Sequence, residues 1–226
     1  MKRPVVAIDG PAGCGKSTVA KLVAEKLGYV YLDTGAMYRA AALAMKKNKI
    51  PAEDEAAIEE QVKKIDIEFK YGARDAGIYL DGENIEDEIR TEKAGMAASV
   101  YSRSPAIRER LVRLQRKMAE NGGVIMEGRD IGTVVFPDAE RKFFLDAKPA
   151  ERARRRAQEL KKRGMEVDEN AILEEVIRRD KQDRERELAP LKPAPDSIII
   201  DTTELDIGSV LKKVLELIDG DNPRAG

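Results

Sequence analysis

Histidine is absent from the 226-residue chain, and cysteine occurs once, as Cys14. Histidine is the commonest general base and a common metal ligand, so chemistry that depends on an imidazole is excluded. A single cysteine excludes a disulfide within the chain. No apolar run approaches the roughly 20 residues of a membrane-spanning helix, and the start MKRPVVAIDG has too short an apolar stretch for a signal peptide. We therefore expect a cytoplasmic protein.

An excess of charge of either sign is also lacking. The chain has 41 basic and 42 acidic residues, which gives a formal net charge of −1. A protein whose main task is to coat nucleic acid or an anionic membrane is expected to carry a strongly positive charge. We therefore expect no nucleic-acid partner and no membrane partner, and any phosphate-binding surface must be local.

Short apolar runs alternate with longer helical patterns, which is typical of a parallel sheet with helices on both faces. Strands are predicted at residues 5–9, 29–33, 124–127, 142–146 and 197–201. Amphipathic helices are predicted near residues 16–27, 36–47, 105–121, 149–163 and 207–219. The length fits one such domain with a small insertion. The fold class is therefore α/β with a five-stranded parallel sheet, and the last residues, 220–226, are predicted to be a disordered tail.

Two segments interrupt this alternation. Residues 67–84, IEFKYGARDAGIYLDGEN, contain two β-rich runs joined by a glycine-containing turn, which predicts a hairpin outside the main sheet, in a small lobe with the helices beside it. Residues 151–163, ERARRRAQELKKR, carry seven basic and two acidic side chains. On a helix Arg152, Arg155 and Arg156 fall on neighbouring turns, so their guanidinium groups can share one face.

The stretch GPAGCGKST, residues 10–18, lies between a predicted strand and a predicted helix and matches the phosphate-loop pattern. Gly10, Gly13 and Gly15 permit backbone angles that other residues avoid, so successive N–H groups can turn toward a phosphate. The helix that follows adds its N-terminal dipole. Lys16 would bridge the terminal phosphates, and Ser17 would bind Mg2+. The loop therefore predicts a nucleoside triphosphate with Mg2+.

The loop alone does not define a reaction, because GTPases, motor ATPases and small-molecule kinases share it. The Asn-Lys-x-Asp motif with which GTPases read guanine is absent, and no predicted strand ends in the clear acidic pair of a motor ATPase. A phosphoryl transferase remains, which needs a second site for the acceptor. A nucleic-acid-binding or regulatory ATPase that uses the basic helix as its contact is a separate alternative.

Three polar clusters are candidates for the acceptor site. DTGAMYR, residues 33–39, and EGRDIGT, residues 127–133, each follow a predicted strand and so lie at the carboxyl edge of the sheet, where ligands bind in open α/β folds. They bring Thr34, Tyr38, Arg39, Arg129 and Asp130 to that edge. The third cluster, RRDKQDRER at residues 178–186, lies in a predicted helix. On its own this third cluster fits a solvated charged face better than a site.

Together the motifs GPAGCGKST, LDTGAMYR, the Ile-Arg-Thr at residues 89–91, EGRDIGT and DRERELAPL resemble, in this order and spacing, the bacterial cytidylate kinases, which phosphorylate CMP and dCMP from ATP. The resemblance runs from about residue 5 to 217 and implies a single P-loop kinase domain. It implies a core of about residues 1–38, 105–148 and 188–219, a nucleoside-monophosphate-binding lobe of about 39–104 that contains the hairpin as an insertion, and a helical lid of about 149–187. It leaves a kinase for another small acceptor as the alternative.

The resemblance also implies roles for matching positions. The catalytic residues are Lys16, Arg39, Arg129 and Arg186. ATP is bound by Gly10, Pro11, Ala12, Gly13, Cys14, Gly15, Lys16, Ser17, Thr18 and Arg155, with Mg2+ on Ser17. The acceptor is bound by Thr34, Arg39 and Arg129 at its phosphate, by Ser99, Arg108 and Asp130 at the pyrimidine, by Arg179 and Asp183 at the ribose, and by Arg186 near the phosphates. The substrates are CMP or dCMP and ATP, and we expect the enzyme to be a monomer.

These roles fit the chemistry of the groups involved. A planar arginine can bind phosphate through two hydrogen bonds. Asp130 can accept a hydrogen bond from the exocyclic amine of cytosine, whereas uracil presents a carbonyl there. The acceptor phosphate has a second pKa of about 6 and is mostly a dianion at pH 7, so it needs no general base. Arg152, Arg155 and Arg156 are candidates for a lid that closes over ATP and expels water.

The chain departs from the family pattern at two positions. Thr34 stands where the family often has serine, which keeps the hydroxyl, and Gln182 stands where an arginine can occur, which removes one cationic contact. Ser102 and Ser104 lie close to Ser99 in the sequence and carry the same hydroxyl. The pyrimidine-reading serine is therefore one of three neighbouring candidates.

Overall fold

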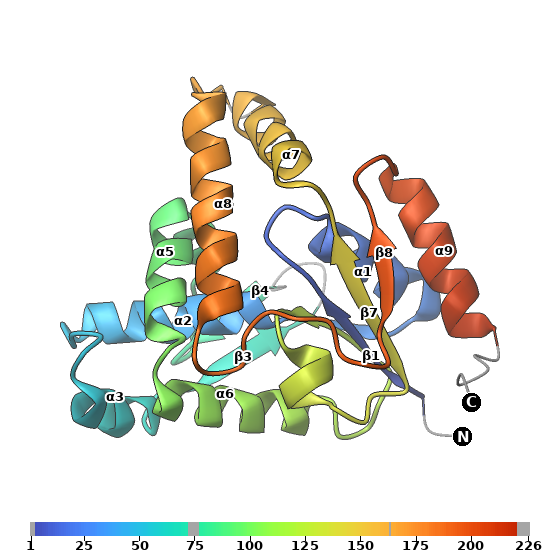
Figure 1. Cartoon of the computed structure of the whole chain (residues 1–226). Coiled ribbons are helices and arrows are strands. Elements are labelled where there is room, and N and C mark those ends of the chain that lie inside the picture. Colours follow the sequence, from blue (N-terminus) through green and yellow to red (C-terminus); the bar gives the residue numbers. More distant parts are fainter. Residues whose placement is uncertain (1–2, 72–76, 163, 221–226) are drawn as a thin grey trace. The chain divides into compact units, whose positions relative to one another are not determined.

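The computed structural model describes residues 3–71, 77–162 and 164–220 (Figure 1). The chain divides into two compact units. The first, here called the phosphate-loop unit, consists of Met1–Tyr31 and Asn121–Gly226. The second, the inserted unit, is Leu32–Glu120. Each unit has its own apolar cluster, and each is described by itself.

A five-stranded sheet with the strand order β2-β6-β1-β7-β8 forms the base of the phosphate-loop unit. The strands are β1 (Val5–Asp9), β2 (Val30–Asp33), β6 (Val124–Gly128), β7 (Arg141–Asp146) and β8 (Ile198–Asp201). β1 pairs in parallel with β6 and with β7, and β7 pairs in parallel with β8. All five strands predicted from the sequence are confirmed, each within one residue at either end.

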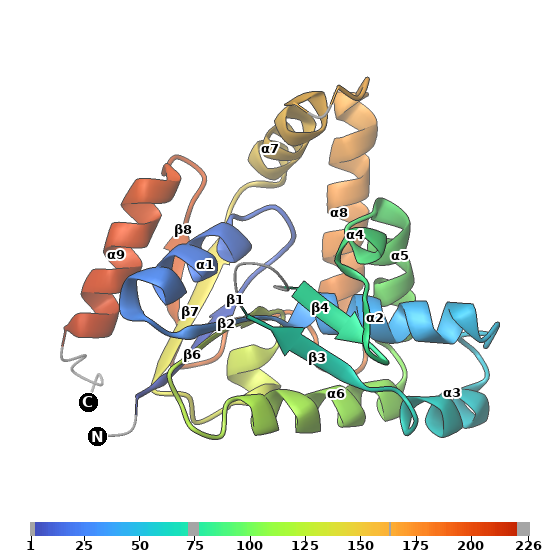
Figure 2. The ribbon, with the colours of Figure 1, turned by 180° about the vertical axis from the view of Figure 1, so that it is seen from behind.

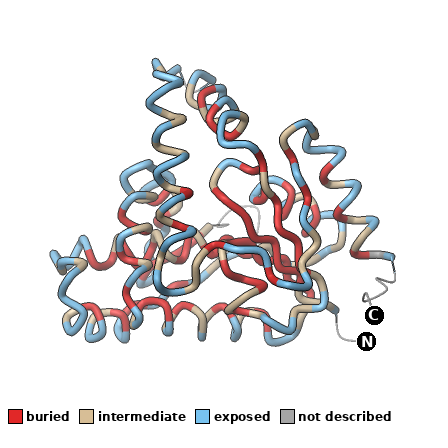
Figure 3. The backbone as a smooth tube through the Cα atoms, viewed as in Figure 1, coloured by how far each residue is buried: buried red, intermediate tan, exposed pale blue. Residues whose placement is uncertain are grey.

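Two helices pack against this sheet, and two others extend from it. α1 (Lys16–Leu27) and α9 (Ile207–Asp219) share an apolar cluster with β1 and β7. Figure 2 shows both helices beside these strands from behind. α7 (Pro149–Lys162) and α8 (Glu169–Glu185) lie side by side in both views (Figures 1 and 2). Figure 3 shows that the central strands are buried along their length, whereas most of α8 is exposed. The predicted helix end at residue 163 and most of the predicted tail, residues 221–226, lie outside the described residues.

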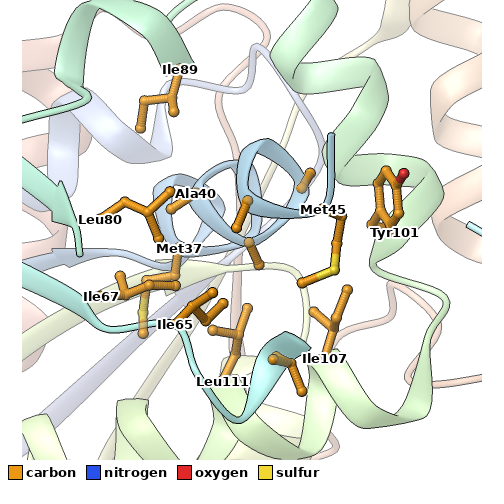
Figure 4. Packing of buried hydrophobic residues seen from close by; sticks show 14 of the residues in the cluster. Met37, Ala40, Met45, Ile65, Ile67, Leu80, Ile89, Tyr101, Ile107 and Leu111 are labelled. Carbon is orange, nitrogen blue, oxygen red and sulfur yellow. The ribbon is translucent and has the colours of Figure 1, made fainter. Parts of the chain in front are cut away.

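The inserted unit surrounds one helix, α2 (Thr34–Lys47), with α3 (Glu55–Val62), α4 (Glu86–Ile89), α5 (Glu92–Tyr101) and α6 (Pro105–Met118). α2 begins two residues before the predicted start, because the Asp33 side chain accepts a hydrogen bond from Ala36 N and caps the helix. Figure 4 shows Met37 and Met45 of α2 among Ile107 and Leu111 of α6 and other apolar side chains. A well-packed helix therefore carries Thr34 and Arg39 in its first two turns.

A small antiparallel sheet completes the inserted unit: β3 (Ile67–Lys70), β4 (Gly77–Leu80) and β5 (Glu83–Asn84). The predicted two-stranded hairpin was incomplete, since β5 adds a third strand. Asp81 and Gly82 between β4 and β5 have φ values of 51° and 83°, the backbone that tight hairpin turns need. The predicted turn between the first two strands falls on residues 72–76, outside the described residues.

Candidate functional site

The phosphate loop connects β1 to α1 and has the predicted backbone. Gly10, Gly13 and Gly15 have φ values of 151°, 78° and 91°, which confirms that these positions need glycine conformations. A Cβ atom at Gly10 would lie 2.1 Å from the carbonyl oxygen of Leu145, so no larger residue fits there. α1 begins at Lys16, directly after Gly15, and its free N–H groups face the loop end.

Lys16 is the buried cation of this loop. Its Nζ donates a hydrogen bond to the Pro11 carbonyl oxygen at 3.0 Å and lies 4.0 Å from Glu127 Oε2. Burial, followed by the nearby positive charge of Arg129, lowers the pKa of the Lys16 ammonium. A bound phosphate would raise the pKa of Lys16 again. It would place a negative charge beside the ammonium, where the loop now supplies only a carbonyl dipole.

Ser17 is the second residue of α1 and is exposed. The described residues contain no group of three or more histidine, cysteine, aspartate or glutamate side chains that could hold a metal ion. Mg2+ in nucleotide sites usually takes few protein ligands and completes its shell with phosphate oxygens and water. One accessible hydroxyl beside the loop therefore fits a magnesium ion that arrives with a nucleotide.

The structure brings together Arg129, which follows β6, and Asp183 of α8. Arg129 Nε donates to Asp183 Oδ2 at 2.9 Å. Burial alone would lower the pKa of the Arg129 guanidinium, but Asp183 raises it above its ordinary value. Burial alone would raise the pKa of the Asp183 carboxyl. The positive charges of Arg129 and, to a smaller extent, Arg179 instead hold this pKa below its ordinary value. Both groups therefore stay charged.

Asp130 and Arg186 form a second, looser pair in the same unit. Arg186 Nη2 lies 3.7 Å from Asp130 Oδ1, and Arg186 Nε donates to the Ala189 carbonyl oxygen at 2.5 Å. Asp130 is buried. The phosphate-loop unit thus contains two ion pairs made by four of the predicted acceptor-binding residues: Arg129 with Asp183, and Arg186 with Asp130.

Asp9, the last residue of β1, anchors the turn that follows Arg129 and Asp130. Its Oδ1 accepts from Ile131 N at 2.9 Å and its Oδ2 from Gly132 N at 2.8 Å. These two N–H groups begin the short π-helical turn η1 (Ile131–Val135). Burial raises the pKa of the Asp9 carboxyl to about 7. The strand that leads into the phosphate loop is therefore tied directly to the turn beside Asp130.

Of the predicted lid arginines, Arg155 lies beside the phosphate loop. Arg155 Nη1 donates to Thr202 Oγ1 at 3.2 Å, and Thr202 Oγ1 donates to the Cys14 carbonyl oxygen at 3.0 Å. Arg156 is half-buried and pairs with Glu159 on the helix surface. Arg152 departs from the expected shared basic face, because its side chain is buried and pairs with Asp180 of α8, whereas Arg155 and Arg156 are less buried. Its part in a lid stays a prediction.

In the inserted unit, Thr34 and Arg39 lie at the start of α2 around Asp33. Asp33 Oδ2 accepts hydrogen bonds from both Arg39 and Arg90, each at 2.9 Å. Burial alone would raise the pKa of the Asp33 carboxyl, but the two guanidinium groups hold it below its ordinary value. Arg39 Nε is buried and has no hydrogen-bond partner among the described residues. This end of α2 therefore holds an N–H group from which a phosphate oxygen could accept a hydrogen bond.

The three neighbouring serines of the inserted unit differ in their contacts. Ser104 caps α6 by accepting from Ile107 N and donates to Glu55, and Ser102 donates to the Ser99 carbonyl oxygen. The hydroxyl groups of Ser102 and Ser104 thus have structural partners within the inserted unit. Arg108 is buried, with its guanidinium carbon 5.8 Å from the ring centre of Tyr38.

Comparison with known proteins identifies the family. The family model described as cytidylate kinase matches residues 6–220. The cytidylate kinase of Caldicellulosiruptor bescii is 50% identical over 217 residues, which is 96% of each chain. That of Bacillus pumilus is 48% identical over 218 residues, 96% of this chain and 97% of the relative. This chain belongs to the cytidylate kinase family. The family resemblance seen in the sequence is therefore confirmed over nearly the full length of the chain.

Solved structures agree with this fold. A shikimate kinase from Bacteroides thetaiotaomicron superimposes with a TM-score of 0.50 at 14% identity, covering 96% of this chain and 99% of that one. At such low identity the likeness shows the fold alone. The predicted P-loop kinase fold is confirmed. Among the described residues, no helix has both the length and the apolar character needed to cross a membrane.

Several residues that contact the candidate site residues of this cytidylate kinase family member were not assigned a role from the sequence. They are Asp9, Asp33, Arg90, Thr202 and Asp180. Asp9 and Asp33 carried a usable signal, because each is an ionisable residue at the end of an apolar strand. Arg90 lies in the Ile-Arg-Thr motif and Asp180 in the cluster RRDKQDRER, but neither residue was assigned a role from the sequence. Thr202 carried no signal, because its partner Arg155 is 47 residues away in the chain.

Proposed function

We propose that this member of the cytidylate kinase family transfers the γ-phosphate of ATP to CMP or dCMP and gives CDP or dCDP and ADP. The proposal rests on the family match over residues 6–220, together with relatives named cytidylate kinase that are about 50% identical to this chain. The phosphate loop supplies the donor chemistry. Formation of ADP that depends on CMP tests the proposal.

ATP is assigned to the phosphate loop, Gly10 to Thr18, and to Arg155. Support comes from the loop backbone and from Arg155, which contacts Thr202 next to the Cys14 carbonyl. Lys16 neutralises the charge that develops on the transferring phosphoryl group. Ser17 would hold Mg2+, which neutralises phosphate charge when it is bound. The exposed position of Ser17 at the start of α1 supports this role.

The acceptor-binding residues are assigned within each unit separately. In the inserted unit, Thr34 and Arg39 are assigned to the acceptor phosphate. In the phosphate-loop unit, Arg129 and Arg186 are assigned to the phosphate, and Arg179 and Asp183 to the ribose. Each phosphate-binding arginine has a carboxylate or carbonyl partner that limits its motion: Asp33 for Arg39, Asp183 for Arg129 and the Ala189 carbonyl for Arg186. Preset guanidinium groups reduce the entropy lost when two anionic phosphates are aligned. No general base is needed, because the acceptor is already ionised.

The division into core, nucleoside-monophosphate-binding lobe and lid is part of this proposal. The basic helix α7 with α8 acts as the lid, and the inserted unit contains the binding lobe. We propose that the enzyme acts as a monomer, since one chain supplies every residue assigned to a substrate. We also assign it to the cytoplasm, where ATP and nucleoside monophosphates are available together.

Replacement of Asp130 with asparagine is expected to relax the preference for CMP over UMP. Asp130, with Ser99 and Arg108, is assigned to the pyrimidine. A carboxylate can only accept at the position where cytosine has an amine and uracil a carbonyl, whereas an amide can also donate. The mismatch is worth about 1–3 kcal/mol. The ratio of kcat/KM for CMP to that for UMP should therefore fall by roughly 5–150-fold.

Asp138→Asn is the matched control, because Asp138 is exposed, lies in the same unit and undergoes the same change of charge. Its CMP-to-UMP ratio should equal that of the wild type. An unchanged ratio in Asp130→Asn would show that Asp130 does not read the base.

A further inference from the structure

Arg152, near the start of α7, joins three separate segments of the phosphate-loop unit. Its side chain is 1% exposed. Nε donates to the Ala147 carbonyl oxygen at 2.8 Å, before α7 begins. Nη1 donates to the Ala12 carbonyl oxygen of the phosphate loop at 3.1 Å and to Asp180 Oδ1 of α8 at 2.9 Å. Nη2 completes a two-bond pair with Asp180 Oδ2. Every nitrogen of the guanidinium group is used.

The contact with the phosphate loop orients a peptide group that a phosphate would meet. The described chain has no cis peptide bonds, so the carbonyl of Ala12 and the N–H of Gly13 point in opposite directions. Because Arg152 holds the Ala12 carbonyl, the Gly13 N–H points away from α7. A Cβ atom on Gly13 would lie 3.3 Å from Cβ of Arg152, so the loop passes close to this residue and leaves little room for a side chain at Gly13.

Arg152 also contacts α8, and this helix is held by two buried aspartates. Asp180 and Asp183 are the buried residues of this helix, and they lie three positions apart, on one face. Asp180 pairs with Arg152, and Asp183 pairs with Arg129. The same helix carries Arg179, assigned to the ribose, directly before Asp180. Movement of α8 relative to α7 would break the Arg152–Asp180 pair, and movement of Arg152 away from the phosphate loop would break its hydrogen bond to the Ala12 carbonyl.

We propose that Arg152 and Asp180 are positioning residues that couple the phosphate loop to the acceptor-binding face of α8. When ATP fixes the conformation of the phosphate loop, the hydrogen bonds of Arg152 to the Ala12 carbonyl and to Asp180 also fix the position of α8. This helix carries Arg179 and Asp183, so each substrate increases the affinity for the other. Such coupling is reciprocal and typically amounts to about 5–150-fold in affinity. The inference rests on the proposed substrates, ATP and CMP.

The test measures binding of a non-hydrolysable ATP analogue by titration calorimetry, with and without saturating CMP. We expect CMP to tighten binding of the analogue by at least about fivefold in the wild type. In Asp180→Asn this enhancement should fall to less than about twofold, because the neutral amide no longer holds the guanidinium. Arg152→Gln should behave in the same way.

Lys161→Gln is the matched control, because Lys161 of α7 pairs with Glu169 of α8 at 2.7 Å on the exposed surface. It removes a salt bridge between the same two helices and should keep the wild-type enhancement. A single variant leaves a buried charge without its partner and can unfold. The double variant Arg152→Met/Asp180→Leu leaves neither charge unpaired, and it should fold and still lack the enhancement.

The outcomes separate the inference from the proposed function. A wild type that binds neither CMP nor the analogue contradicts the proposed function. A wild type that binds both without enhancement overturns the coupling. So do folded variants that keep the wild-type enhancement, since a role limited to stability would lower the melting temperature and leave the enhancement unchanged.

Discussion

Lys16→Met is expected to lower kcat with ATP and CMP by on the order of 10²–10³-fold, the loss seen when a preorganised charge-stabilising group is removed from a transition state. Methionine has nearly the length of lysine and fits the buried position, but it cannot neutralise the phosphates. Lys16 Nζ is held in the phosphate loop by the Pro11 carbonyl, so the wild-type ammonium is already placed before ATP binds. Initial rates at saturating ATP and CMP measure the effect.

Lys21→Met is the control for this variant. Lys21 lies on the same helix, α1, is exposed, and has its ammonium 5.4 Å from the ring centre of Tyr31. The change in charge and in side chain is identical, so Lys21→Met should keep the wild-type kcat. A kcat for Lys16→Met close to that of Lys21→Met would remove Lys16 from the mechanism.

The buried carboxyl of Asp9 is expected to make stability depend on pH. Its pKa is about 7 in the folded protein against an ordinary value of 3.8, because burial disfavours the charged form. The folded state therefore binds more protons than the unfolded state between these values, and the free energy of unfolding falls as pH rises through this window. The shift corresponds to about 4 kcal/mol in total, and no further loss is expected above pH 7.

The difference in free energy of unfolding between wild type and Asp9→Asn isolates this contribution. Asp33 and Asp183, whose pKa values are lowered, act in the opposite direction as pH falls, but they are common to both proteins and cancel. Urea denaturation at several pH values should show the wild type losing stability relative to Asp9→Asn from about pH 4 to pH 7. A difference that does not vary with pH would show that Asp9 titrates normally.

The fold could be predicted because its signals are local. Each strand of the main sheet is a short apolar run, and residues 10–18 combine a strand end, a glycine loop and a helix start. β5 was missed because two residues are too few to show alternation, although Asp81 and Gly82 are a typical hairpin turn. α2 began earlier than predicted because Asp33 ends a strand and caps a helix at once.

From the residues alone, candidate site residues could be identified where a motif places a side chain at a strand end, whereas Asp183 and Arg186 were assigned only through the family resemblance. Arg129 and Asp130 follow β6 in this way, and the structure places them beside partners from α8 and its C-terminal end. Arg152 shows the limit. In the sequence it is one of several arginines on a charged helix, and nothing local distinguishes the one that points inward. Its burial depends on Asp180, 28 residues away, and on the phosphate loop, 140 residues away.

Whether the acceptor is a cytidine monophosphate is tested most directly by an acceptor panel: purified protein with ATP and Mg2+, and ADP formation measured with CMP, dCMP, UMP, AMP, shikimate, RNA or DNA. We expect rapid ADP formation with CMP and dCMP, much slower formation with UMP, and background rates with the others. Equal rates with all acceptors, or stimulation by RNA or DNA without phosphorylation of CMP, would contradict it.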